Sequence, residues 1–471
     1  MNIQELITQL SNNPLYIANN RSNVSRWDQW YSGYVPSFHQ YSVYNGKKCN
    51  VMRMSSLQMA KKVSEDWADL LFNERVGITL IDDKSNENFR KIFKKLNGPV
   101  VINQGIEWAF AQGTVAFVLT LTKESNLALE CVKSVNIYPI TTENNRVTEC
   151  AFISYKLIDG VSCAYVSIHR KNSLGEYAIE NAIYSLVEGS TDILGATPVK
   201  YWTFDTHSTI PWFAVYTPNS LNNFDDYSPF GISVFANAIA ELQSIDNSFD
   251  AIENEVTNGR MRIIVGTESL NIGQDGVYPV FDARDTVFHQ IPKDINDRNI
   301  IETIAPKLRT EDLISTLNSS LAMLCNKCGL SSDYYIYSKN QGLKTATEVI
   351  SSNSPMYRRI KKHEIILEDV INTLVAGIAN VCSSFLNIPI NAESIYIQFD
   401  DSIIQDTDSE RKADLIDIKY GILPRYQYRM KWYNEDELTA KRTVEDATEE
   451  IKNNPVDNQI NNEFTTEPQS I

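Results

Sequence analysis

The chain has 471 residues, of which 43% are hydrophobic and 22% charged, a balance typical of a folded protein with two or three domains. A formal net charge of −16 argues against a protein that grips nucleic acid tightly, because each phosphate contact needs a Lys or Arg. It is compatible with a protein along which DNA slides. No apolar run predicts a transmembrane helix, and the start of the chain lacks a secretory pattern. Seven scattered cysteines, an odd number, favour a reducing cytosol.

The first part of the chain predicts an α+β domain. A strong amphipathic helix is expected within Met54 to Arg75, a strand from Val76 to Ile81, and a helix from Ile102 to Gln112. Between Thr114 and Val187, five short segments rich in β-branched and aromatic residues are separated by Asn, Asp, Gly or Ser. These segments predict an antiparallel sheet beside helices.

A long acidic helix is expected within Phe230 to Asn258, ended by Gly259 and about 40 Å long. Steps of four and three residues put its apolar side chains on one stripe: Ile232, Phe235, Ile239, Leu242, Ile245, Phe249, Ile252 and Val256. Between Ile232 and Asn258 there is no Lys, Arg or His. Its acidic residues are Glu241, Asp246, Asp250, Glu253 and Glu255. The sequence therefore predicts a polar face of one sign, placed where repelling anions is harmless or useful.

The rest of the chain predicts a hairpin of helices followed by more helix. A small β-rich insert after Gly259 leads to a returning helix from Arg309 to Cys328. An irregular segment then precedes a helix from about Thr345 to Leu386, which Pro355 should kink or interrupt. A strand follows at residues 394–401, where it could complete the first sheet. Two amphipathic helices at 408–420 and 434–452 are expected before a disordered tail.

No catalytic constellation is evident. The motif of Cys325 and Cys328 has no further ligands at zinc spacing and indicates two buried helix residues. The adjacent aspartates, 225–226 and 400–401, could hold Mg²⁺ in a nuclease-type site, but their setting favours turns. The densest basic run could meet phosphate or an acidic partner, although acids one turn later favour a solvated helix face. Its basic residues are Arg358, Arg359, Lys361 and Lys362. No cofactor or metal is predicted.

The order of several segments resembles the portal, or head-to-tail connector, proteins of tailed bacteriophages, above all the branch of long-tailed phages of Gram-positive hosts. The segments are WDQWYSG (27–33), MAKKVSEDWADLLFNE (59–74), PFGISVFANAIAELQSID (229–246), NEVTNGRMRIIV (254–265) and GLKTATEVISSNS (342–354). None is a catalytic signature, and the likeness lies in their order and spacing over nearly the whole chain.

The resemblance implies an α+β portal architecture. Residues 1–230 would form an α/β wing, 231–258 and 300–330 the two stem helices, and 259–299 a small β-rich clip. Residues 331–343 would be the tunnel loop, 344–404 a long kinked helix and a strand closing the wing, and 405–471 a helical crown with a disordered tail. The tunnel loop would present Tyr334, Tyr335, Tyr337, Ser338, Lys339, Asn340 and Gln341.

The resemblance also implies a structural protein rather than an enzyme. Such subunits form a homo-oligomeric ring of about twelve at one capsid vertex, through which double-stranded DNA is packaged and ejected. The implied partners are non-specifically sliding DNA, the large terminase, a head-completion adaptor, and the major capsid and scaffolding proteins, with no membrane. The implied location is the virion, with the host cytoplasm during virus assembly.

Under that interpretation the five acids of the long helix line the DNA tunnel, because carboxylates repel phosphate and lower the barrier to sliding. Glu241, Asp250 and Glu253 are the central hypothesis. Two alternatives stay open. One is a metal-dependent nucleic-acid enzyme that uses the aspartate pairs, and the other is a head-tail adaptor or minor capsid protein.

Overall fold

The computed structural model describes residues 5, 15–44, 48–121, 126–144, 146–187, 189–190, 192–195, 197–259, 262–266, 288–291, 301–304, 307–336, 346–399, 407–433 and 439–446. The fold is α+β, as the sequence predicts. The chain forms two compact units. One comprises residues 1–342 and 352–400, and the other comprises residues 343–351 and 401–471.

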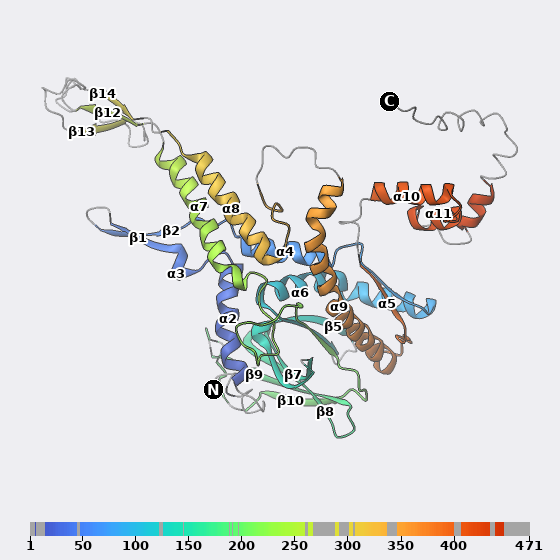
Figure 1. Cartoon of the computed structure of the whole chain (residues 1–471). Coiled ribbons are helices and arrows are strands. Elements are labelled where there is room, and N and C mark those ends of the chain that lie inside the picture. The colour runs from blue at the N-terminus through green and yellow to red at the C-terminus, as the bar shows by residue number, and fades with distance from the viewer. Residues whose placement is uncertain are drawn as a thin grey trace, which may run out of the picture. The chain divides into compact units, whose positions relative to one another are not determined.

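Two antiparallel sheets organise the first unit (Figure 1). The larger has the order β10 (Lys200–Asp205), β9 (Tyr177–Ser185), β8 (Val161–Lys171), β7 (Arg146–Ile158) and β6 (Ile137–Glu143). The smaller has the order β11 (Phe213–Tyr216), β4 (Val115–Leu121) and β5 (Leu127–Lys133). Alternate side chains of each strand point to opposite faces, so one apolar cluster joins Ala116 and Val118 of β4 to Phe152 of β7. The expected antiparallel sheet is confirmed, divided in two.

Helices pack beside the smaller sheet: α2 (Leu15–Tyr31), α4 (Met59–Leu71), α5 (Asp83–Lys95) and α6 (Gly98–Gln112). Trp67 of α4 lies at their centre and is 1% exposed. Its ring stacks on Phe110 with centroids 5.3 Å apart and meets His363 edge-on at 5.2 Å. The indole nitrogen donates to the Cys328 carbonyl at 3.1 Å, which satisfies the one polar atom of a buried Trp.

The expected strand at residues 76–81 is present as β3 (Gly77–Leu80). It pairs antiparallel with β15 (Ile395–Gln398), the strand expected at residues 394–401. The two strands form a separate two-stranded sheet. The expectation that β15 completes the first sheet is therefore wrong.

Helix α9 (Ala346–Phe385) continues through Pro355, so of the two effects expected from this proline, a kink or an interruption, the interruption is wrong. Its segment from Pro355 to Phe385 is long and apolar enough to cross a membrane by length and composition. More than half of the most apolar window is buried inside the protein, however, as in the core helix of a globular fold. Leu367, Leu374 and Ile378 are each at most 2% exposed.

Helices α7 (Ile239–Asn258) and α8 (Thr310–Cys328) lie side by side as a helical hairpin (Figure 1). Between them in sequence lies the expected β-rich insert, with the strand order β13 (Phe288–Ile291), β12 (Arg262–Gly266) and β14 (Ile301–Ile304). Strand β12 is parallel to β13 and antiparallel to β14. Residues 277–282, which belong to the expected β-rich insert, lie outside the described residues.

Helix α7 begins seven residues later than the apolar stripe predicts, and its 20 residues span about 30 Å rather than 40 Å. The preceding segment crosses the end of α6. Val234 donates its backbone N–H to the Phe110 carbonyl at 2.8 Å, and Gly231 donates to the Thr114 hydroxyl at 3.0 Å. A Cβ built on Gly113, which caps α6 at φ +89°, would lie 2.4 Å from the Gly231 carbonyl oxygen. Carbonyls at the end of α6 need donors, and this crossing supplies them.

A two-stranded ribbon that the sequence analysis did not predict follows α3 (Pro36–His39). Strand β1 (Gln40–Tyr44) pairs antiparallel with β2 (Cys49–Arg53), from Gln40 opposite Arg53 to Tyr44 opposite Cys49. We call it the β1–β2 arm. In Figure 1 it extends from α3 as a ribbon of its own.

The second unit contains α10 (Thr407–Lys419) and α11 (Arg425–Tyr433), and residues 439–446 are helical. Asp414 accepts from the Lys431 ammonium and the Trp432 indole, both at 2.7 Å, and so joins α10 to α11. Helix α10 agrees with the expected helix at 408–420 and residues 439–446 with part of the one at 434–452, whereas α11 was not expected. The tail after 446 lies outside the described residues.

Candidate functional site

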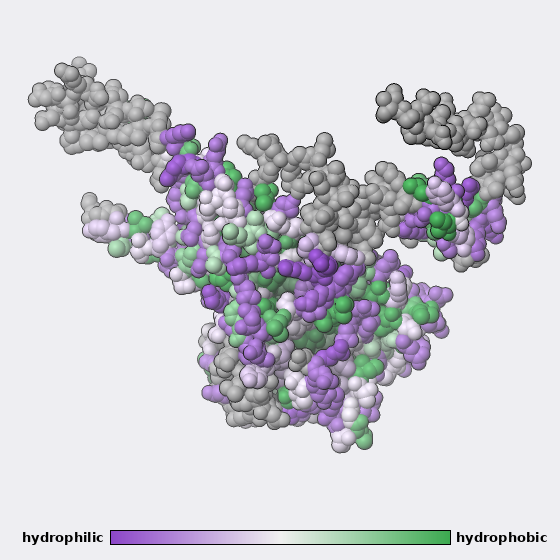
Figure 2. Space-filling view, in the orientation of Figure 1, coloured by the Kyte–Doolittle hydropathy of each residue, from purple (hydrophilic) through white to green (hydrophobic). Residues whose placement is uncertain are grey.

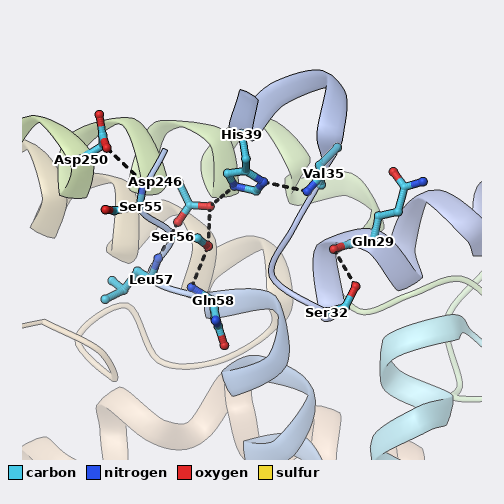
Figure 3. Close-up of polar contacts among 10 residues, drawn as sticks. All are labelled: Gln29, Ser32, Val35, His39, Ser55, Ser56, Leu57, Gln58, Asp246 and Asp250. Atoms are coloured by element: carbon cyan, nitrogen blue, oxygen red, sulfur yellow. Dashed lines mark hydrogen bonds and ion pairs between the residues drawn. The ribbon is translucent and has the colours of Figure 1, made fainter. Parts of the chain in front are cut away.

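The acids of α7 are the predicted site residues, and the structure separates them by role. Asp246 is 3% exposed. Its carboxylate accepts from the His39 Nε2 at 2.9 Å, the Ser56 hydroxyl at 2.9 Å and the Leu57 backbone N–H at 2.8 Å (Figure 3). A carboxylate enclosed by three donors cannot present charge to a tunnel. The prediction that Asp246 lines the tunnel is therefore wrong, because donors from residues 39–57 enclose it.

His39 has a fixed tautomer in this cluster. Its Nδ1 accepts the Val35 backbone N–H at 2.8 Å, so the ring proton must sit on Nε2, which faces Asp246. The ring is fully buried and packs edge-on against Trp30 and Phe38. His39 therefore joins the start of the β1–β2 arm to α7 through a hydrogen bond of defined direction.

The segment that follows β2 contacts the next turns of α7. Ser55 donates its backbone N–H to Asp250 at 3.0 Å, and its hydroxyl donates to Glu253. Asp250 also accepts from the Asn254 side chain at 2.8 Å. Asp250 is half-buried and Glu253 is exposed. Both therefore lie on the flank of α7 that contacts residues 55–57.

The remaining two acids pair with a cation of α8 and with the residue that precedes it. The Glu241 carboxylate lies 2.7 Å from the Lys327 ammonium, and the Glu255 carboxylate lies 2.9 Å from the Arg309 guanidinium. The hydrogen bond from Arg309 lowers the pKa of Glu255. The polar face of the helix is acidic only, as predicted, but at these two positions its charge is neutralised by residues more than 50 positions away in the sequence.

The root of the predicted tunnel loop is anchored. Residues 331–336 form a turn in which the Tyr335 hydroxyl donates to Asp66 of α4 at 2.6 Å. Burial raises the pKa of Tyr335, and this hydrogen bond to Asp66 raises it further. Lys62 also donates to Asp66, at 2.6 Å. The ring of Tyr334 packs edge-on against Tyr335 and is 41% exposed. The other predicted loop residues lie outside the described residues: Tyr337, Ser338, Lys339, Asn340 and Gln341.

The basic run on α9 is a mixed helix face, the alternative that the sequence favoured. Arg358, Arg359 and Lys362 are exposed, whereas Lys361 is half-buried and lies 2.9 Å from Glu364. His363, the residue after Lys362, is buried, and its Nδ1 accepts the Asn219 backbone N–H at 3.0 Å. Burial lowers the pKa of His363 to about 4.

The groups with possible metal or redox chemistry have structural settings. Cys325 and Cys328 are both buried in α8, as expected, and burial raises the pKa of each thiol. Asp225 accepts the Tyr227 backbone N–H at 3.2 Å as a turn former. Asp400 and Asp401 lie outside the described residues. Within the part of the chain that the structure describes, no group of three or more His, Cys, Asp or Glu side chains could hold a metal ion.

The partners of the α7 acids, namely His39 and the Ser55–Leu57 segment, were not predicted from the sequence. A signal was available, because Asn45-Gly46 between alternating residues is a strong hairpin signal. Glu311 and Asp312, which are exposed at the start of α8, were not predicted either.

Comparisons with known proteins give the family. The family described as "Phage portal protein, SPP1 Gp6-like" matches residues 16–416. Among solved structures, the chain is similar to one described as "Neck of native GTA particle computed with C12 symmetry". That match has 10% identity, covers 79% of this chain and 88% of that chain, and has a TM-score of 0.37. A second, "Neck of empty GTA particle computed with C6 symmetry", has 12% identity, coverage of 79% and 87%, and the same TM-score. A search of curated proteins finds no match. Because the family match spans most of the sequence, the chain belongs to the SPP1 Gp6-like family of phage portal proteins.

Proposed function

We propose that copies of this portal protein close into a ring, of about twelve subunits, at one capsid vertex, and that double-stranded DNA enters and leaves the capsid through it. The family match over residues 16–416 is the observation that carries the proposal. Residues 1–230, closed by residues 344–404, would form the wing, α7 and α8 the stem, and the sheet of β12, β13 and β14 the clip. The second unit would contribute the crown.

The helical hairpin supports a subunit interface. Its helices and the residues just before α8 expose large apolar side chains: Val256, Leu308, Ile314 and Met323, between 42% and 60% exposed. Single exposed apolar residues are ordinary, but four on one helical hairpin suit a surface that a second subunit covers. A head-to-tail contact of this kind gives a closed ring when the rotation between subunits closes.

Charge repulsion of DNA would come from a smaller set of acids than the sequence predicts. Glu241 and Glu255 are ion-paired and Asp246 is enclosed, which leaves Asp250 and Glu253 of the original five. Carboxylates along the path of a duplex disfavour binding in any one register, because each phosphate carries a negative charge.

The partners of the ring follow from its family. Terminase and a head-completion adaptor would dock in turn on the clip, while scaffolding and major capsid proteins would surround the wing. These contacts would be made in the host cytoplasm during assembly. The proposed role is structural, with ATP hydrolysis supplied by the terminase.

Size in solution tests the ring. Purified full-length protein should elute as a species many times its 53.5 kDa subunit mass and show a central hole in negative stain. Replacing Glu253 by Lys should leave the ring intact and reduce DNA packaging. A monomer at all concentrations, with or without scaffolding protein, would contradict the proposal. Unchanged packaging in Glu253→Lys would contradict the role of the acids alone.

A further inference from the structure

The β1–β2 arm is a two-stranded ribbon whose strands are exposed. Val43, Val51 and Met52 are 45%, 60% and 47% exposed. Because side chains alternate along a strand, Val43 and Met52 lie on one face of the ribbon and Val51 on the other. Figure 2 shows apolar residues among polar ones on the visible side of this ribbon. Two-stranded hairpins are marginally stable alone, so a ribbon with apolar side chains on both faces is suited to packing against another surface.

The root of the arm, in contrast, is firmly fixed. His39 before β1 and Ser55 to Leu57 after β2 bind Asp246 and Asp250 of α7 through directed hydrogen bonds (Figure 3). Arg53, at the end of β2, lies over the Tyr34 ring at 4.5 Å. The arm is therefore held at one end on α7, and this pre-ordering lowers the entropy cost of docking its strands elsewhere.

The arm is basic, and its charge is complementary to that of the α7–α8 hairpin. Residues 40–53 contain three basic residues and no acidic one. Helix α7 contains five acidic residues and no basic one, and α8 contains two acidic residues and one basic one. The arm and the helical hairpin thus have complementary charge, and both expose apolar side chains.

Within one subunit, Asp246 and Asp250, the acids of α7 nearest to the arm, already accept hydrogen bonds from the residues that flank the arm. A second copy of the chain presents the same acidic and apolar surface, including Glu311, Asp312 and Ile314 of α8. We propose that the β1–β2 arm of each subunit docks on the α7–α8 hairpin of the neighbouring subunit, as a clasp between adjacent stems. This inference rests on the proposed ring, because the docking surface belongs to another copy.

The exposed thiol of Cys49 on β2 provides a built-in probe. In the full-length protein, size exclusion separates ring from subunit, and each fraction is treated with a maleimide. The Leu157→Cys variant is the control, because Leu157 is 73% exposed near the end of β7, in another hairpin. Docking should slow modification of Cys49 by about ten-fold or more in the ring relative to the subunit, while the control thiol reacts equally in both.

Paired substitutions test the chemistry of the clasp. Val43→Ser with Val51→Ser should shift the subunit–ring equilibrium towards subunits, whereas Leu157→Ser with Val161→Ser, which also removes exposed apolar side chains, should not. Lys48→Glu should weaken the ring, and Glu311→Lys with Asp312→Lys in the same chain should restore it.

The outcomes separate the two proposals. An intact ring in which Cys49 reacts as fast as in the subunit overturns the clasp and leaves the ring in place. The same holds if the Val43 and Val51 substitutions leave the equilibrium unchanged, since the arm would then serve a different protein. Absence of any ring removes the proposed function itself.

Discussion

The two halves of α7 use the same residue types for different purposes. In the inner half, Leu242 and Ile245 are at most 2% exposed and Asp246 accepts three hydrogen bonds from a segment some 200 residues earlier. In the outer half, Glu253 and Val256 are exposed, and Glu255 binds the guanidinium and the backbone N–H of Arg309. Acidic residues on one helix therefore divide into an internal anchor and surface groups.

This difference follows from what covers each turn. A carboxylate out of water needs donors for its lone pairs, and residues 39–57 provide them around Asp246 and Asp250, with one further hydroxyl, that of Ser55, on Glu253. Beyond that point the helix has α8 on one side, and solvent hydrates the remainder. The inner half ties the β1–β2 arm to the helix, whereas the outer half is available to DNA or to a neighbouring subunit.

The largest expected effect tests the anchor. Asp246→Ala leaves His39, Ser56 and the Leu57 N–H without their acceptor in a buried site, and should lower the free energy of unfolding by about 3 kcal/mol. Glu253→Ala, the matched change in the outer half, should cost less than about 0.5 kcal/mol. Thermal unfolding of the two variants at one protein concentration measures the contrast. Equal losses would show that the halves do not differ.

The pH dependence of the free energy of unfolding tests another buried polar group, His363. His363 has a pKa of about 4 in the folded chain, against about 6.5 when exposed. The unfolded chain thus takes up the proton first, and stability falls as the pH drops from about 6.5 to about 4. Between about pH 7 and pH 5 the loss from this group should be about 2 kcal/mol.

The variant His363→Gln isolates that contribution. Glutamine keeps an acceptor for the Asn219 N–H but does not titrate, so denaturant unfolding should depend less on pH than in the parent protein. A pH profile identical to that of the parent would assign the acid sensitivity to other groups.

A smaller effect is expected where the loop root meets α4. Tyr335→Phe removes one hydrogen bond to Asp66, which keeps its bond to Lys62, and should cost about 1 kcal/mol. Hydrogen exchange of residues 331–336 should increase with it. Tyr334→Phe, on the neighbouring exposed ring, is the control and should change neither quantity. Unchanged exchange in Tyr335→Phe would mean that packing alone holds the turn.

The smallest effect is expected at the outer ion pair. Glu255→Gln should lower the melting temperature slightly at low ionic strength and not at high salt, because exposed pairs are screened. The lowered pKa of Glu255 means that the contribution of the pair is lost as the pH falls through that value. A shift that survives high salt would indicate that Glu255 acts through packing rather than charge.

Sequence patterns predicted the elements whose burial repeats with a regular period. The strands between residues 114 and 187 alternate, and the expected antiparallel sheet is present. The burial of Cys325 and Cys328 also followed from their helical setting. Ile232 and Phe235 fit the same stripe as α7 but are buried by the crossing over α6, a contact that periodicity cannot reveal.

The candidate site was predicted less well, for a physical reason. The five acids were identified, but the role of each depends on partners remote in sequence: His39 for Asp246, Lys327 for Glu241 and Arg309 for Glu255. Helix periodicity places a side chain on a face and says nothing of what approaches that face. The family resemblance had the same limit, because it concerns the order of segments rather than single contacts.

The crossing of Gly113 and Gly231 has a mechanical consequence. A Cβ on either residue would lie within 2.5 Å of the other's carbonyl oxygen, so the two backbones touch with no side chain between them. Such a joint has no soft layer to absorb rotation. A force on the outer end of α7 would therefore displace α6 and the strand after it, because the contact is too rigid to act as a hinge.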